Sequence, residues 1–226
     1  MDLVTTPDGG VCVVGENAAL KQNWLLKTDA SGEKQWAKIL PVTDWGFPVL
    51  IANAAGGFTI LANRDGRSDF IITDQSGTVM KYIDLEIQSN RFTQLTDGRY
   101  VVVSNPGGGK IWLLDAEGGK IWERELQDAR GVVATKDGHF VIMGYENETY
   151  FLTKWDTHGN ELWRQSYPQL EARPFQYLFN KIVENAEGGI SFIGFTDGTS
   201  AFIAKTDADG HLICAATSNW KTTRSY

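Results

Sequence analysis

The sequence predicts an all-β protein with the fold of a five-bladed β-propeller, in which each blade is a sheet of four antiparallel strands. The first observation is an Asp-x-x-Gly turn that recurs five times, most completely at residues 156–163. The glycines of this turn lie at positions 32, 77, 118, 159 and 210, in steps of 45, 41, 41 and 51 residues. The second observation is a tight-turn signal and an apolar run upstream of every copy. A repeat of this length, with two turn signals and apolar runs between them, is typical of one propeller blade.

Each recurring turn predicts a hairpin. Asp at the first position of a type I turn accepts hydrogen bonds from backbone N–H groups further along, and Gly at the last position takes the left-handed conformation. The structural residues predicted in this way are Asp29 and Gly32, Asp74 and Gly77, Asp115 and Gly118, Asp156 and Gly159, and Asp207 and Gly210.

Three of the turns are followed by a tryptophan, four residues after the glycine: Trp36, Trp122 and Trp163. Lys81 and Cys214 occupy this position in the other two. Exposed tryptophans can stack on sugars, but a fixed place in a repeat favours packing between blades, because a buried Trp fills a large volume between sheets. We therefore expect these three side chains to be buried between neighbouring blades.

Each unit is predicted to contain four strands, with tight turns after the first and the third. The units cover about residues 1–40, 48–84, 91–126, 131–167 and 181–216, and a helical turn is expected only within 168–180. The first tight turns are Asp8-Gly9, Ala55-Gly56, Asp97-Gly98, Asp137-Gly138 and Glu187-Gly188. Because a small sheet cannot cover both of its faces, we expect the five units to stack into a single domain spanning residues 1–226.

Composition narrows the class of protein. Hydrophobic residues at 42% and charged residues at 22% are typical of a globular protein, and no apolar run approaches 18 residues, so no membrane insertion is expected. A net charge of −7 argues against a nucleic-acid partner, which requires a basic surface. No signal peptide is visible, because residues 3–5 already read as a strand; either the protein is cytoplasmic or an export segment has been removed.

The frame Asp-x-x-Gly-x-x-x-Trp after an apolar strand resembles the repeat of the pyrroloquinoline-quinone-like β-propellers, in which the Trp docks one blade onto the next. The Asp-Gly-Gly at 8–10 and the Lys-Thr-Asp at 27–29 and 205–207 are similar to repeats of many secreted bacterial propellers. The resemblance covers nearly the whole chain but only scaffold positions. It implies a propeller in a periplasmic or extracellular setting and permits several functions.

No cofactor or metal is expected. The quinone-dependent alcohol dehydrogenases of this family carry adjacent cysteines beside the cofactor, whereas Cys12 and Cys214 are far apart in sequence. These two lie in the first and last units, so a disulfide between the units is an alternative to two free thiols. Segment 207–210 lacks the third acid and closing Glu of a calcium loop, and segment 107–110 lacks the spacing of a phosphate-binding loop. The histidines at 139, 158 and 211 show no ligand spacing.

Two functions remain open. The first is a non-catalytic binding or scaffold role toward a protein or glycan. The second is a carbohydrate-active, glycosidase-like enzyme, which needs paired carboxylates at one mouth of the propeller. No motif connects the acids that could lie near a rim, which are Asp44, Glu86, Asp128, Glu146, Glu171 and Glu184.

The binding surface is expected on the rim that holds the second connection of each unit and the links between units. These segments vary in length, and varied loops on a rigid scaffold usually carry recognition. Aromatic and Arg side chains there resemble binding hot spots, although the aromatics of segment 165–180 could instead fill their own loop. The predicted ligand-binding residues are Trp45, Phe47, Arg91, Arg130, Arg173, Phe175 and Tyr177.

Overall fold

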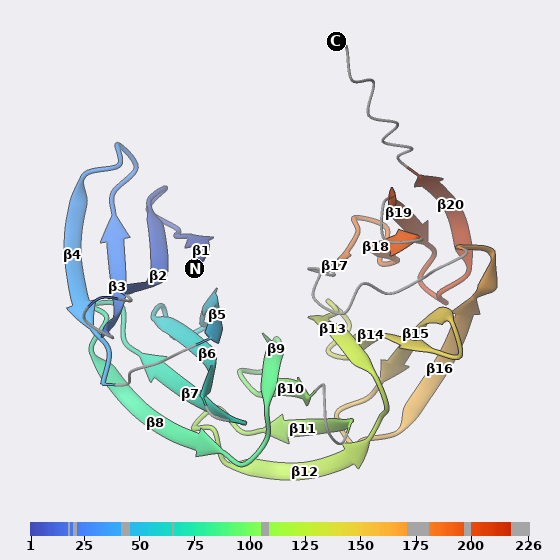
Figure 1. Cartoon of the computed structure of the whole chain (residues 1–226), viewed down its shortest axis with the longest axis horizontal. Helices are drawn as coiled ribbons and strands as arrows, with labels where there is room; N and C mark the ends of the chain where they lie inside the picture. Colours follow the sequence, from blue (N-terminus) through green and yellow to red (C-terminus); the bar gives the residue numbers. More distant parts are fainter. Residues whose placement is uncertain are drawn as a thin grey trace. The chain divides into compact units, whose positions relative to one another are not determined.

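The computed structural model describes residues 1–17, 19, 22–41, 46–64, 66–104, 109–170, 181–196 and 200–217. These residues form five sheets, each of four antiparallel strands in an order that follows the chain. This arrangement confirms the predicted all-β class and the five-bladed β-propeller fold, with one sheet for each blade (Figure 1). We call the sheets one to five. The backbone contacts divide the chain into two compact units, Met1–Glu125 with sheets one to three and Leu126–Tyr226 with sheets four and five.

The described residues of the first unit form twelve strands. Sheet one consists of β1 (Asp2–Thr5), β2 (Val11–Asn17), β3 (Gln22–Thr28) and β4 (Lys34–Ile39). Sheet two consists of β5 (Gly46–Ala52), β6 (Phe58–Arg64), β7 (Arg67–Thr73) and β8 (Val79–Leu85). Sheet three consists of β9 (Ser89–Gln94), β10 (Tyr100–Ser104), β11 (Lys110–Leu114) and β12 (Lys120–Glu125).

The second unit contains eight strands and a single helical turn among its described residues. Sheet four consists of β13 (Ala129–Ala134), β14 (Phe140–Glu146), β15 (Thr149–Trp155) and β16 (Glu161–Tyr167). The 3-10 helix η1 (Pro168–Leu170) begins the expected helical segment, whose remainder lies outside the described residues. Sheet five consists of β17 (Ile182–Glu184), β18 (Ile190–Thr196), β19 (Ser200–Thr206) and β20 (Leu212–Thr217). No described helix is long and apolar enough to cross a membrane.

The Asp-x-x-Gly turn forms in all five sheets as the sequence predicts. In the first copy the Gly32 N–H donates to the Asp29 carbonyl at 3.1 Å, and Asp29 Oδ1 accepts from two backbone N–H groups at 2.9 and 3.0 Å. The last copy repeats this, because Asp207 Oδ1 accepts at 3.0 and 2.8 Å. Every closing glycine has a φ between 74° and 88°, the left-handed region that favours glycine.

Apolar clusters lie between consecutive sheets of each unit. In the first unit, one cluster joins sheets one and two around Cys12, Leu25 and Ile60, and another joins sheets two and three. In the second unit, a cluster around Tyr150 and Phe202 joins sheets four and five. Within each unit the first strands lie side by side, and the side chains of the fourth strands are mostly exposed. Stacking therefore buries both faces of sheet two, which has a neighbouring sheet on each side within its unit.

The strand order gives each sheet two distinct ends. The first and third connections lie at one end, which we call the turn end. The second connection and the link to the next sheet lie at the other, which we call the loop end. The links range from residues 86–88 to residues 168–181. The second connections are less irregular than expected, because those of sheets two and four are only two residues long. In sheet four this connection is a tight turn, with Asn147 and Glu148 at φ 48° and 61°.

Candidate functional site

The structure describes the side chains of two of the seven predicted ligand-binding residues, Arg91 on β9 and Arg130 on β13. Phe47 belongs to β5, but its side chain lies outside the described part of the chain. Trp45, Arg173, Phe175 and Tyr177 lie outside the described residues altogether. Their assignment to a binding surface therefore stays a prediction.

Arg91 lies in the group of first strands of the first unit. Burial lowers the pKa of Arg91, and the nearby carboxylate of Asp2 on β1 opposes this shift. Asp2 Oδ2 also accepts a hydrogen bond of 2.9 Å from the backbone N–H of Leu50 on β5. The carboxylate of Asp2 on β1 thus interacts with residues of both β5 and β9. The Arg91 side chain beside it is half-buried.

Arg130 lies near the loop end of sheet four. Its guanidinium is 5.3 Å from the ring centre of Tyr145, and one terminal nitrogen is 3.7 Å from Asp128 Oδ1. The ring of Tyr145 in turn meets the ring of Tyr150 edge-on at 5.2 Å. Since only 16% of the Arg130 side chain is exposed, it presents little surface to a ligand, although the adjacent Asp128 is about half exposed.

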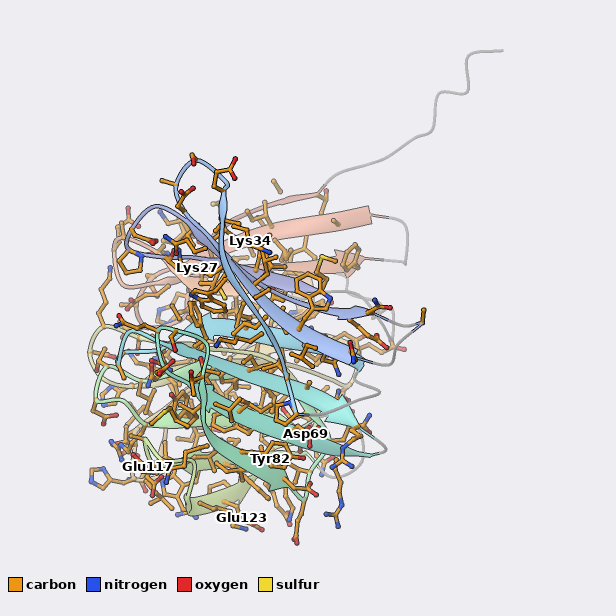
Figure 2. All side chains as sticks on the ribbon, turned by 90° about the vertical axis from the view of Figure 1, so that its left-hand side faces the viewer. Lys27, Lys34, Asp69, Tyr82, Glu117 and Glu123 are labelled. Atoms are coloured by element: carbon orange, nitrogen blue, oxygen red, sulfur yellow. The ribbon has the colours of Figure 1, made fainter. Side chains whose placement is uncertain are left out.

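A charged network at the loop end of sheet two was not predicted. Asp69 on β7 is fully buried, and its two carboxylate oxygens each accept a hydrogen bond of 3.3 Å from Arg64. The hydroxyl of Tyr82 on β8 donates to Asp69 Oδ1 at 2.7 Å. Asp84 lies opposite Asp69 on β8 and is 3.0 Å from Arg67 and 3.7 Å from Arg64. Figure 2 shows Asp69 and Tyr82 next to each other on this sheet.

The network positions charged groups beside the second connection of sheet two. Arg64 and Arg67 lie opposite each other on the two sides of this tight turn. Their side chains are 34% and 54% exposed, whereas Asp69 beneath them is inaccessible. Burial raises the pKa of the Tyr82 phenol, and its hydrogen bond to Asp69 does so further. Tyr82 therefore stays a hydrogen-bond donor, and the buried carboxylate fixes the guanidinium of Arg64.

A comparison of the repeats would have marked Asp69 as a departure from the pattern. Five residues before the turn aspartate, units one, four and five have Trp24, Phe151 and Phe202, whereas unit two has Asp69 and unit three has Lys110. Each of these aromatic rings lies over a glycine of the neighbouring strand, so that a Cβ at Gly15, Gly144 or Gly194 would overlap the ring. Unit two has Ala62 opposite Asp69. The sheet thus replaces an aromatic-on-glycine pair with a buried carboxylate.

At the turn ends, the carboxylates bond mainly within their own sheet. Besides the five turn aspartates, the carboxylate of Asp8 in the first connection accepts from Lys27 Nζ at 2.8 and 3.0 Å. Asp137 does the same for Lys154 at 2.6 Å. Hydrogen bonding to Lys27 lowers the pKa of Asp8 well below its usual value. These acids are therefore occupied by their own turns and by a lysine of the third strand.

The structure describes four of the six candidate acids of the enzyme hypothesis, and Asp128 among them is about half exposed beside Arg130. Glu146 lies at the loop end of sheet four and pairs with Arg164 at 2.6 Å. Glu184 ends β17 at the turn end, where it accepts from the backbone N–H of Lys136 at 3.1 and 3.2 Å. Glu86 lies in the first unit, and Asp44 and Glu171 fall outside the described residues. Among the described side chains, no three potential metal ligands lie together.

Trp36 and Trp163 lie at boundaries between neighbouring sheets of one unit but are only half-buried. A Cβ on Gly77 of sheet two would lie 2.6 Å from the Trp36 ring, and one on Gly210 of sheet five 2.7 Å from the Trp163 ring. Ile83, two residues beyond Lys81, covers Gly118 in the same way. Trp122 is also half-buried. Their outer edges stay exposed because they lie on the fourth strand, at the margin of each sheet.

Cys12 and Cys214 are both free thiols. Cys12 is buried, which raises the pKa of its thiol to about 12, and Cys214 is exposed on β20.

Comparisons with known proteins support the propeller fold. Virginiamycin B lyase from Staphylococcus aureus has a TM-score of 0.73 at 14% identity, over 98% of this chain and 70% of that chain. A Bacteroides caccae protein of unknown function has a TM-score of 0.65 at 10% identity, over 96% of this chain and 81% of its own. BBS1N, solved in complex with ARL6DN, has a TM-score of 0.63 at 13% identity, over 92% of this chain and 64% of its own. Identities this low show the fold alone. No protein-family model and no curated protein sequence matches the chain.

Proposed function

We propose that this protein is a non-catalytic binding or scaffold β-propeller that presents the loop ends of its sheets to a protein or glycan partner. The observation that carries the proposal is the difference between the two ends. At the turn ends, the aspartates accept hydrogen bonds within their own turns and from lysines. At the loop end of sheet two, the buried carboxylate of Asp69 holds Arg64, and Arg64, Arg67 and Asp84 remain partly exposed.

Such a network fits recognition because it is held in place before a partner arrives. Arg64 is fixed by two hydrogen bonds to Asp69, so less side-chain freedom is lost when a carboxylate or hydroxyl of the partner binds. Arg and Tyr are also the side chains that dominate binding hot spots. Trp45 and Phe47 stay predicted members of the same binding surface.

The enzyme alternative has weaker support. The only carboxylate pair on directly opposed positions within the described loop ends is Asp69 and Asp84. Both oxygens of Asp69 accept from Arg64 and its side chain has no exposed surface. A glycosidase requires an accessible nucleophile or base beside a general acid. Asp69 is therefore better suited to orienting Arg64 than to chemistry.

The setting and family are part of the same proposal. The Asp-x-x-Gly-x-x-x-Trp frame favours membership of the pyrroloquinoline-quinone-like repeat family and a periplasmic or extracellular location. Among the structural neighbours, BBS1N is solved in complex with ARL6DN, and virginiamycin B lyase with quinupristin, so propellers serve both binding and catalysis. The net charge of −7 favours a protein or glycan partner over nucleic acid.

The proposal is tested by a glycan array and a pull-down with the intact chain, followed by affinity measurements on variants. We expect the triple variant of Trp45, Arg173 and Tyr177 to Ala, and separately Arg67→Glu, to lose binding while melting like the wild type. Lys136→Glu makes the same charge reversal at the turn end of sheet four and serves as the control. Binding lost in Lys136→Glu but kept in the other variants would place the site at the turn ends and overturn the proposal.

A further inference from the structure

The fourth strand of each sheet is an edge strand, and β20 of sheet five differs from the other four. In every sheet the fourth strand ends the strand order, and β20 pairs with β19. No other described strand lies beside its second edge. The unpaired N–H and C=O groups of such an edge can pair with another chain, and natural edge strands usually carry charges that prevent this.

Four of the five edge strands have this protection. β4 contains Lys34 and Lys38, and β8 contains Lys81 and Asp84. β12 has four charged residues among its six, and β16 has Glu161 and Arg164. The sequence of β20 is Leu-Ile-Cys-Ala-Ala-Thr, without a charge, a proline or a glycine. Five of its six residues are exposed, and Ile213 retains 59% of its surface.

We propose that β20 is a dimerisation edge, which pairs antiparallel with β20 of a second copy of this chain to join two copies of sheet five into one continuous sheet. A two-fold axis places the same strand on both sides, so residues near the axis face their own copies. A charge there would meet the same charge. β20 avoids this although the chain carries a net charge of −7.

The side chains of β20 also permit close approach of the two backbones. Cys214, Ala215 and Ala216 at its centre are small, and strands in a sheet approach to about 4.8 Å. The small residues leave the backbone groups accessible, and Ile213 contributes apolar area near the end of the pairing. The small, uncharged side chains of β20 therefore permit its backbone to pair with a second copy of the same strand.

The test is sedimentation velocity of the intact chain over a concentration series that extends to high protein concentration. We expect wild type to form a dimer, and Ala215→Lys to weaken dimerisation by roughly tenfold or more, because like charges face each other across the axis. Ala37→Lys is the matched control, since Ala37 on β4 pairs with Leu26 as Ala215 on β20 pairs with Ala204. It should dimerise like the wild type.

Hydrogen exchange locates the contact independently. The amides of residues 212–217 should exchange more slowly at high concentration in wild type, but not in Ala215→Lys. Ile203→Lys examines the exposed face of the same sheet, where Ile203 is 55% exposed. A wild-type chain that stays monomeric throughout, a dimer with unchanged exchange at β20, or a dimer broken by Ile203→Lys and not by Ala215→Lys would each overturn the proposal.

Discussion

At the scale of single residues, Asp69 shows how one departure from a repeat reorganises its surroundings. An aromatic at this position needs a glycine on the neighbouring strand, as Phe151 does with Gly144. A carboxylate needs donors instead, and Arg64 and Tyr82 provide them. Because a buried charge without partners is very unfavourable, these three residues depend on one another.

We predict that Asp69→Ala lowers the free energy of unfolding by about 1–3 kcal/mol, because the hydroxyl of Tyr82 and one side of the Arg64 guanidinium lose their acceptor. Asp84→Ala should cost less than about 1 kcal/mol, since its pairing with Arg67 is largely at the surface. Urea unfolding of both variants measures the difference. Equal losses would show that Asp69 does not organise the network.

The first-connection aspartates predict a loss of stability in acid. Burial raises the pKa of Asp137, but hydrogen bonds from Lys154 and Thr135 outweigh it and hold the pKa well below its usual value. A lowered pKa in the folded state means that stability is present above the unfolded pKa of about 4 and is lost as pH falls below it. In Asp137→Asn this contribution is absent, so unfolding measured from pH 7 to pH 3 should show a shallower decline than wild type. An unchanged slope would contradict this role.

At the scale of elements, the turns were predictable and the loop-end network was not. The Asp-x-x-Gly motif specifies its own hydrogen bonds within five residues, so the hairpins follow from local sequence. The Asp69 network joins β6, β7 and β8 through strand register, which a motif does not encode. Comparison of equivalent positions gives the missing signal for Asp69, because it breaks a repeated aromatic. The degree of exposure of the tryptophans also required the structure, since it depends on where each sheet ends.

A double substitution tests the aromatic-on-glycine rule. Asp69→Phe alone should be destabilising, because the Cβ of Ala62 occupies the place of the glycine that lies under the ring in sheets one, four and five. Adding Ala62→Gly should recover part of the loss, with an interaction energy of about 1 kcal/mol. Thermal melting of the two single variants and the double variant gives this energy. An additive result would show that the pairing is incidental.

The tryptophan contacts predict the strength of sheet docking. Trp163 on β16 covers Gly210 of sheet five and packs against the shared cluster of sheets four and five. Because its ring is half-buried, Trp163→Ala should cost about 3 kcal/mol, at the low end for a core tryptophan. Leu162→Ala is the adjacent control, 48% exposed, and should change stability by less than about 0.5 kcal/mol. If Trp163→Ala had the same melting temperature as wild type, Trp163 would not stabilise the packing of sheet four on sheet five.

At the scale of the whole molecule, stability is expected to come from the surfaces between sheets. Within the second unit, sheets four and five bury Tyr145, Tyr150 and Leu152 against Phe192 and Phe202. Hydrogen bonds cross the same boundary: Tyr150 Oη accepts from the Phe195 N–H at 3.3 Å, and Tyr167 Oη donates to the Gly210 carbonyl at 2.6 Å. Each of these two hydrogen bonds is lost if either sheet is removed. In stacked repeats such neighbour interfaces provide most of the free energy of folding.

Removal of sheet five is therefore the broadest test of this architecture. A chain ending before Lys181 leaves the cluster face of sheet four bare, including Tyr150 and Tyr167, whose burial raises the pKa of both phenols. Exposed apolar surface of this extent favours association, so we expect the fragment to be insoluble or to associate with itself. Sedimentation and calorimetry of the fragment beside the intact chain measure this. A monomeric fragment that unfolds cooperatively near the parent melting temperature would show that the sheets are stable without their neighbours, and the expected single domain of residues 1–226 would then be wrong.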